Sequence, residues 1–247
     1  MDRKKIAFTL AETLVTLMII GVVAVLTIPE LILSYKKQQT VTQLKKAYSE
    51  INQAIKLSEV DNGNMSAWFV GSELQAKRDW AKNYFIKYFK VARECVPLSR
   101  DCFDGSALPD SYYSEDSKMF GFITLSGYSI MGWNHGGGNG GWLYVDVNGP
   151  KKGPNTFGND IFALIMQFDE NYNINGIEAN KVVDNSGVFF AGLGLNTPLT
   201  REELINGGGN TPNSFKNATC NKESNKKLTC GALIVTDGWR ITDDYPW

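Results

Sequence analysis

The stretch from Lys4 to Pro29, KKIAFTLAETLVTLMIIGVVAVLTIP, decides how this chain is organised. Within residues 8–28 only Glu12 carries a charge. A helix of about 20 apolar residues crosses a hydrocarbon core of about 30 Å, and the basic residues at positions 3–5 are expected to keep the amino end in the cytoplasm. Because a polar, helix-like segment follows in place of a small-residue cleavage site, we expect the membrane span to be retained.

Glu12 does not fit an inert anchor. A carboxylate inside a spanning helix costs roughly 2.5–3.5 kcal/mol on insertion scales, and such residues generally have a partner. In one interpretation Glu12 lies near the cytoplasmic interface and reaches water. In the other it pairs with a positive charge from another subunit, and the residues around it favour this second interpretation.

Residues 5–12, KIAFTLAE, followed by an apolar run, resemble the class III leader of type IV pilins and type II secretion pseudopilins. The resemblance implies that a prepilin peptidase cuts between Ala7 and Phe8, that Phe8 is then N-methylated, and that Glu12 is the glutamate needed for assembly. Ala7 is a departure, since the family often has Gly before the cut. Pro29 falls where many pilins carry a helix-bending proline, and Gly21 lies shortly before it.

This resemblance implies a structural subunit, not an enzyme, that polymerises into a type IV pilus or a type II secretion pseudopilus. Its implied partners are other pilin or pseudopilin subunits, prepilin peptidase, an inner-membrane assembly platform and membrane lipid. It would be a single-pass protein of the bacterial inner membrane, with a cytoplasmic amino end and an external head. In a filament, the amine of Phe8 can lie beside Glu12 of a neighbour, which would remove most of the cost of an unpaired buried charge and favour one axial register.

The alternative is a membrane-anchored external binding module that never polymerises, such as an adhesin or receptor head. An anchored hydrolase has little support, because His135 is the only histidine and no nucleophile motif accompanies it. A net charge of −1, from 25 basic and 26 acidic residues, gives no global field that would attract nucleic acid.

Four segments are predicted along the chain: a leader (1–7), a transmembrane helix (8–28), an amphipathic helix (29–60) and a globular head (61–247). From Thr40 to Leu57 apolar residues recur every three or four positions and form one stripe, which predicts a helix lying on the head. Pro29 removes one helical N–H and predicts a kink. Turn-forming residues at 61–64 are expected to end the helix.

The head is predicted to be α+β and pilin-like, with the long helix packed on an antiparallel sheet. A second helix is expected over Ser72–Ala92, because aromatic residues repeat there at helical spacing, and an irregular loop over 95–118. A capping-box pattern at Thr200–Glu203 predicts a short helix ending at Asn206–Gly207. Hairpin turns are expected at 126–127 and 170–171. Strands are predicted at 120–125, 128–133, 142–147, 161–168, 187–190 and 233–236.

The four cysteines form two close pairs, Cys95 with Cys102 and Cys220 with Cys230. In an exported domain these spacings favour two local disulfides, although three connectivities are possible. A zinc site is a rival interpretation, but neither spacing is C-x-x-C. Free buried thiols are the other alternative.

Two loops invite a ligand-binding interpretation. The glycine-rich stretch 132–142 lacks the Lys-Ser/Thr ending of a phosphate loop, so a hairpin connection is preferred. Asp146 and Asn148 begin like a calcium-binding EF-hand loop, but Phe157 stands where its closing glutamate belongs. Major pseudopilins place a calcium-stabilised loop in their carboxyl half, so Asp146, Asn148 and Asp160 are candidate calcium ligands. The alternative is a rigid loop whose polar side chains cap their own backbone.

Overall fold

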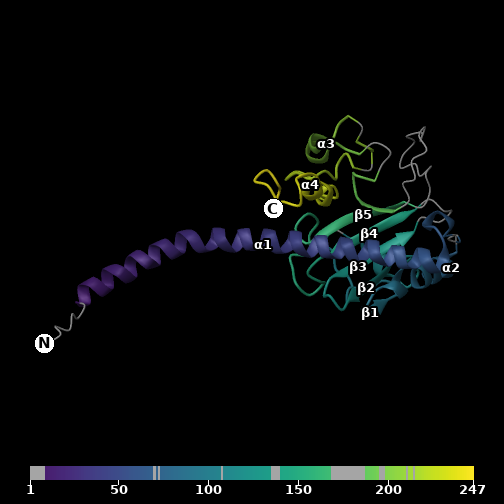
Figure 1. Cartoon of the computed structure of the whole chain (residues 1–247), viewed down its shortest axis with the longest axis horizontal. Coiled ribbons are helices and arrows are strands. Elements are labelled where there is room, and N and C mark those ends of the chain that lie inside the picture. Colours follow the sequence, from purple (N-terminus) through teal and green to yellow (C-terminus); the bar gives the residue numbers. More distant parts are fainter. Residues whose placement is uncertain are drawn as a thin grey trace. The chain divides into compact units, whose positions relative to one another are not determined.

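The computed structural model describes residues 9–68, 71, 73–106, 108–134, 140–167, 187–194, 198–209, 211–213 and 215–247. The chain comprises two compact units, Met1–Gln39 and Thr40–Trp247. The first helix, α1 (Leu10–Asn62), supplies the described part of the first unit and then continues into the second (Figure 1). The unit boundary therefore falls inside the predicted amphipathic segment 29–60.

In the first unit α1 leaves its apolar side chains exposed on all sides. Leu10, Leu17 and Val25 are among many large hydrophobic residues that contact little else. The helix continues through Gly21 and Pro29 without a break in its assignment. Within the described residues, α1 is the one helix long and apolar enough to cross a membrane.

In the second unit α1 buries one face. The side chains of Leu44, Ala47, Ile51 and Ile55 lie in the main hydrophobic core of the head. These are positions of the stripe expected from the sequence, so the predicted amphipathic helix is confirmed. The helix ends at Asn62, and the following Gly63 has a φ of 78°, a conformation that glycine adopts without steric penalty.

The sheet of the head is a six-stranded antiparallel meander in which every strand pairs with its neighbours in sequence. This confirms the predicted α+β class, and a long amino-terminal helix with an antiparallel sheet is consistent with a pilin-like fold. The strands are β1 (Val91–Cys95), β2 (Phe120–Thr124), β3 (Ser129–Asn134), β4 (Gly141–Asp146), β5 (Ile161–Gln167) and β6 (Gly187–Phe190).

Both faces of this sheet are buried. Alternate residues of β4 and β5, such as Leu143 and Leu164, join the core that contains α1. The residues between them, such as Trp142 and Ile165, form a second core with Phe215 on the other face. The period of two follows from strand geometry, because successive side chains point to opposite faces.

The predicted helix over Ser72–Ala92 is shorter than expected. It comprises α2 (Leu74–Trp80), a π-helical turn η2 (Ala81–Phe85) and a 3-10 turn η3 (Ile86–Tyr88). The chain then becomes extended because Val91–Cys95 pairs with β2, so β1 is a strand that the sequence analysis missed. The aromatic residues of this segment face the core, where the Phe85 and Phe120 rings lie 5.9 Å apart.

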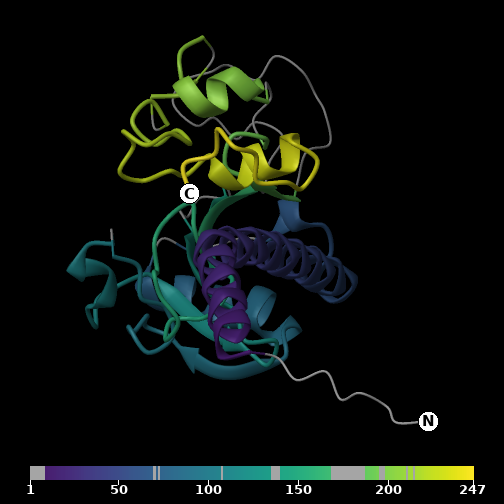
Figure 2. The ribbon, with the colours of Figure 1, turned by 90° about the vertical axis from the view of Figure 1, so that its left-hand side faces the viewer.

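The predicted strand at 233–236 is wrong, since these residues belong to the helix α4 (Cys230–Thr236). A short apolar run does not distinguish a buried strand from a buried helix. The predicted short helix is confirmed as α3 (Arg201–Asn206), with a capping box between Thr200 and Glu203. Figures 1 and 2 show α4 lying between α3 and the end of the sheet.

Local connections match the sequence analysis where the structure describes them. Disulfides join Cys95 to Cys102 and Cys220 to Cys230, and both adjacent pairings are therefore confirmed. The turn at 126–127 closes the β2–β3 hairpin with Gly127 at a φ of 91°. The turn predicted at 170–171 lies outside the described residues.

Candidate functional site

At its first turn, α1 carries an interaction that the sequence analysis missed. The Thr9 hydroxyl donates to Glu12 Oε2 at 2.8 Å, and Thr9 N donates to the same oxygen at 2.8 Å. In return, Glu12 N donates to Thr9 Oγ1 at 3.2 Å. This reciprocal arrangement is a capping box, and the pattern T-x-x-E at positions 9–12 could have predicted it. Glu12 thus caps the beginning of its own helix.

The hydroxyl groups of the first unit are also used within the helix. Thr13 donates to the Leu10 carbonyl at 2.9 Å, Thr16 to the Thr13 carbonyl at 2.9 Å, and Thr27 to the Val23 carbonyl at 2.9 Å. In an apolar medium an unpaired hydroxyl would carry a desolvation penalty. These bonds make the segment compatible with lipid despite its threonines.

The structure tests the other predictions for this segment, the cleavage and methylation sites and the helix kink, only in part. Ala7 and Phe8, the predicted cleavage and methylation sites, lie outside the described residues. Gly21 has no neighbouring atom where a Cβ would stand. Pro29 interrupts the backbone hydrogen bonding without ending the helix, and the kink predicted there stays a prediction.

The candidate calcium ligands are brought together at one end of the β4–β5 hairpin. Asp146 is the last residue of β4, and Asp160 immediately precedes β5. The Val147 amide donates to the Asp160 carbonyl at 2.9 Å, which closes the loop between them. Both side chains are buried, with exposed fractions of 0% for Asp146 and 2% for Asp160.

Backbone amides hold both carboxylates in place. Asp146 Oδ1 accepts hydrogen bonds from the Asn148 and Gly149 amides at 3.1 and 2.9 Å. Asp160 accepts from the Asn155 amide at 2.8 Å and the Thr156 amide at 2.7 Å. Burial and the nearby carboxylate of Asp160 raise the pKa of Asp146 to about 7. Burial also raises the pKa of Asp160.

Several buried oxygens around these two carboxylates have no hydrogen-bond partner among the described residues. No set of three His, Cys, Asp or Glu side chains in the described part of the chain could hold a metal. A calcium site, however, is commonly completed by amide, hydroxyl and carbonyl oxygens, and the residues here fit such an ion. The unpartnered oxygens are Asp146 Oδ2, Asn148 Oδ1, Asn155 Oδ1, Thr156 Oγ1, Asn159 Oδ1 and Ser129 Oγ.

Ser129 is a member of this group that sequence reasoning missed. It lies directly opposite Asp146 in the β3–β4 register, so the two side chains share one face of the sheet. Directly opposite residues have Cβ atoms about 4.5–5.5 Å apart. Only the strand register, which the sequence does not display, places the two together.

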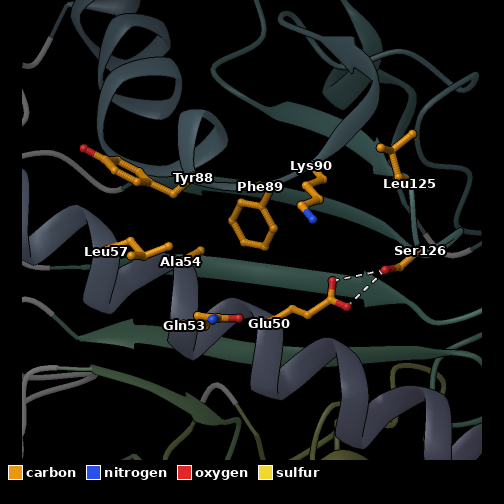
Figure 3. A pocket seen from close by; sticks show the side chains of 9 residues that line it. All are labelled: Glu50, Gln53, Ala54, Leu57, Tyr88, Phe89, Lys90, Leu125 and Ser126. Atoms are coloured by element: carbon orange, nitrogen blue, oxygen red, sulfur yellow. Dashed lines mark hydrogen bonds between the residues drawn. The ribbon is translucent and has the colours of Figure 1, made fainter.

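The head also has a shallow groove of about 360 Å³ between the end of α1 and the β2–β3 turn. Figure 3 shows Leu57 on one side, Leu125 on the other and Glu50 at one end. The Glu50 carboxylate accepts hydrogen bonds from Ser126 Oγ at 3.0 Å and Tyr128 Oη at 2.8 Å. These bonds hold α1 against the β2–β3 hairpin, so the Glu50 carboxylate stabilises the fold. The glycine-rich stretch 132–142 joins the antiparallel strands β3 and β4, as the predicted hairpin connection requires, and His135 lies outside the described residues.

Comparison with known proteins places most of the chain in one family. A family model described as a family of unknown function, DUF6613, matches residues 30–247. Neither the curated proteins nor the solved structures provided a match. The matched span begins immediately after Pro29 and includes the whole head. The chain therefore belongs to the DUF6613 family.

Proposed function

We propose that this chain is a prepilin-type structural subunit, cleaved before Phe8, N-methylated there and polymerised into a type IV pilus or a type II secretion pseudopilus. The observation that carries the proposal is the exposed apolar surface of α1 over residues 10–28, which is interrupted by the single carboxylate of Glu12. Such a surface needs a covering of lipid or of other apolar helices. A filament core would supply the second covering after the membrane has supplied the first.

The capping box suggests how Glu12 serves both environments. In the uncut chain its carboxylate accepts two bonds from Thr9, which reduces the penalty of placing it near lipid. Cleavage before Phe8 creates a positive amine one residue before Thr9. In a stack of subunits that amine pairs with Glu12 of a neighbour, and the pair selects one axial register.

Glu12→Gln tests this step. Glutamine retains the ability to complete a capping box, so the variant removes the charge while preserving the start of the helix. An unpaired buried charge costs about 3–5 kcal/mol. We therefore expect filaments sheared from cells that express the assembly machinery to fall at least about tenfold, with normal membrane levels of the subunit.

Glu30→Gln is the matched control, because Glu30 is an exposed glutamate on the same helix. Its filament yield should equal that of the unmodified chain. Intact-mass measurement of the mature subunit should give a chain that begins at methylated Phe8. Undiminished filaments from Glu12→Gln, or a mature chain that retains residues 1–7, would contradict the proposal and favour a non-polymerising, anchored binding module.

A further inference from the structure

The exposed apolar surface of α1 continues beyond Pro29 and so beyond the predicted transmembrane segment 8–28. Leu31 and Tyr35 are exposed, and so are the two apolar residues that follow Leu31. This second apolar run lies within the part of the chain that matches the family model. Like the first run, it needs a covering that is at least partly apolar.

The length of the helix places Tyr35 near the edge of a bilayer. From Leu10 to Tyr35 α1 rises about 38 Å, because each helical residue adds about 1.5 Å. The hydrocarbon core is about 30 Å thick, and the headgroup regions bring the bilayer to about 40–45 Å. With Leu10 at one edge of the core, Glu30 reaches the opposite edge and Tyr35 lies among the headgroups. Tyrosine is enriched at this depth, because its ring is apolar and its hydroxyl is polar.

Two lysines follow Tyr35 directly, and α1 offers them no acidic neighbour. None of the ion pairs found among the described residues includes Lys36 or Lys37. An ion pair on a helix surface requires an acidic residue three or four positions away. The sequence has no Asp or Glu within residues 31–49. The two positive charges therefore stand together at the end of the apolar surface.

The next two lysines of α1 show the contrast. Lys45 lies over the Trp239 ring, with 5.7 Å between the ammonium nitrogen and the ring centroid. Lys46 pairs with Glu50 at 3.9 Å. These two lysines contact groups of the head, whereas the pair at positions 36 and 37 faces the surroundings of the first unit.

We propose that Tyr35, Lys36 and Lys37 bind the headgroups of anionic phospholipids in the leaflet at the head end of the membrane span. The two ammonium groups contact lipid phosphates, and the alkyl stems of the lysines lie along the apolar surface of the helix. The Tyr35 ring lies at the boundary between acyl chains and headgroups. This contact sets the depth of α1 in the bilayer. The inference rests on the membrane span of the proposed function, but not on polymerisation.

The test uses the full chain with Tyr35→Trp, which retains an interfacial aromatic residue. The chain is reconstituted in phosphatidylcholine vesicles that contain a fixed fraction of lipid brominated near the headgroup, either phosphatidylglycerol or phosphatidylcholine. Bromine quenches a tryptophan that lies next to it, and the chain without this substitution gives the background from the tryptophans of the head. We expect the relative association constant to favour phosphatidylglycerol about tenfold, and high salt should reduce this preference.

Variants of the lysine pair identify the groups responsible. Lys36→Gln combined with Lys37→Gln should abolish the preference, whereas the corresponding pair of arginine substitutions should retain it because the charges remain. Lys151→Gln combined with Lys152→Gln is the matched control, since these are also adjacent, exposed lysines, and it should retain the preference. Thermal unfolding of the head should be the same in all these chains.

The possible contrary results are distinct. Equal quenching by the two brominated lipids would overturn the headgroup site and leave the membrane span intact. A preference that persists in the glutamine pair, or disappears in the arginine pair, would overturn the role of the two lysines. Absence of quenching by either lipid would overturn the site together with the span on which the proposed function depends.

Discussion

The two parts of α1 place the same kinds of side chain in opposite surroundings. Ile20, in the first unit, is 64% exposed, whereas Ile51, in the second, is 0% exposed. In the first unit apolar residues surround the helix, and in the second polar residues confine them to one stripe. The difference shows that periodicity separates a helix that needs an external apolar environment from one that completes its own domain.

The largest expected effect comes from shortening matched isoleucines in the two parts. Ile51→Ala should destabilise the head by about 2–5 kcal/mol, because it removes buried methyl groups and leaves a cavity. Ile20→Ala should leave head unfolding unchanged. Thermal unfolding of the full chain in detergent, followed by near-UV circular dichroism, measures both. Equal effects of the two substitutions would contradict the separation of the helix into two environments.

Adding a charge should have the opposite pattern of effects, because membrane insertion should depend on the first part of α1 and not on the second. Val22→Lys places an ammonium group near the middle of the predicted span and should disfavour insertion by about 2.5–3.5 kcal/mol. Gln53→Lys, on the exposed face of the head part, should have no effect on insertion. Carbonate extraction of membranes compares the inserted fractions. Full membrane retention of a Val22→Lys chain would argue that this segment does not span lipid.

The smallest effect concerns matched tyrosines. Tyr48 Oη donates to the Val188 carbonyl at 3.1 Å and so ties α1 to β6, whereas Tyr35 is exposed in the first unit. Tyr48→Phe should lower the free energy of unfolding by about 0.5–1.5 kcal/mol through the lost hydrogen bond. Tyr35→Phe should not change it. Urea denaturation resolves the pair, and identical midpoints would indicate that the Tyr48 bond makes no net contribution.

The sequence predicted the elements whose signal is periodic over many residues. The stripe on α1 and the alternating strands β2 to β5 follow directly from burial of one face or of alternate positions. Periodicity led to wrong predictions where tertiary contacts decide whether a segment is a helix or a strand. Val91–Cys95 became a strand because β2 provides a pairing edge, and residues 233–236 became helical in a short buried run that suits either structure.

The candidate calcium loop was predictable in part for the same reason. Asp146 and Asn148 lie two residues apart, and their spacing is visible in the sequence. Asp160 joins them because β4 and β5 form a hairpin. Ser129 could not be found, since its position opposite Asp146 depends on the register of another strand. Residues close together in the sequence can be predicted to share a loop. Residues that approach from another strand can be found only from the folded structure.

The hydroxyl bonds inside α1 have a further consequence for transfer between environments. The Thr13, Thr16 and Thr27 hydroxyls each find their acceptor within their own helix. Moving the helix from lipid into a protein interior would therefore break none of these bonds and would require no replacement acceptors. The free-energy difference between the two states would then depend on apolar contacts and on how the charge of Glu12 is paired, so one ion pair could control the equilibrium between them.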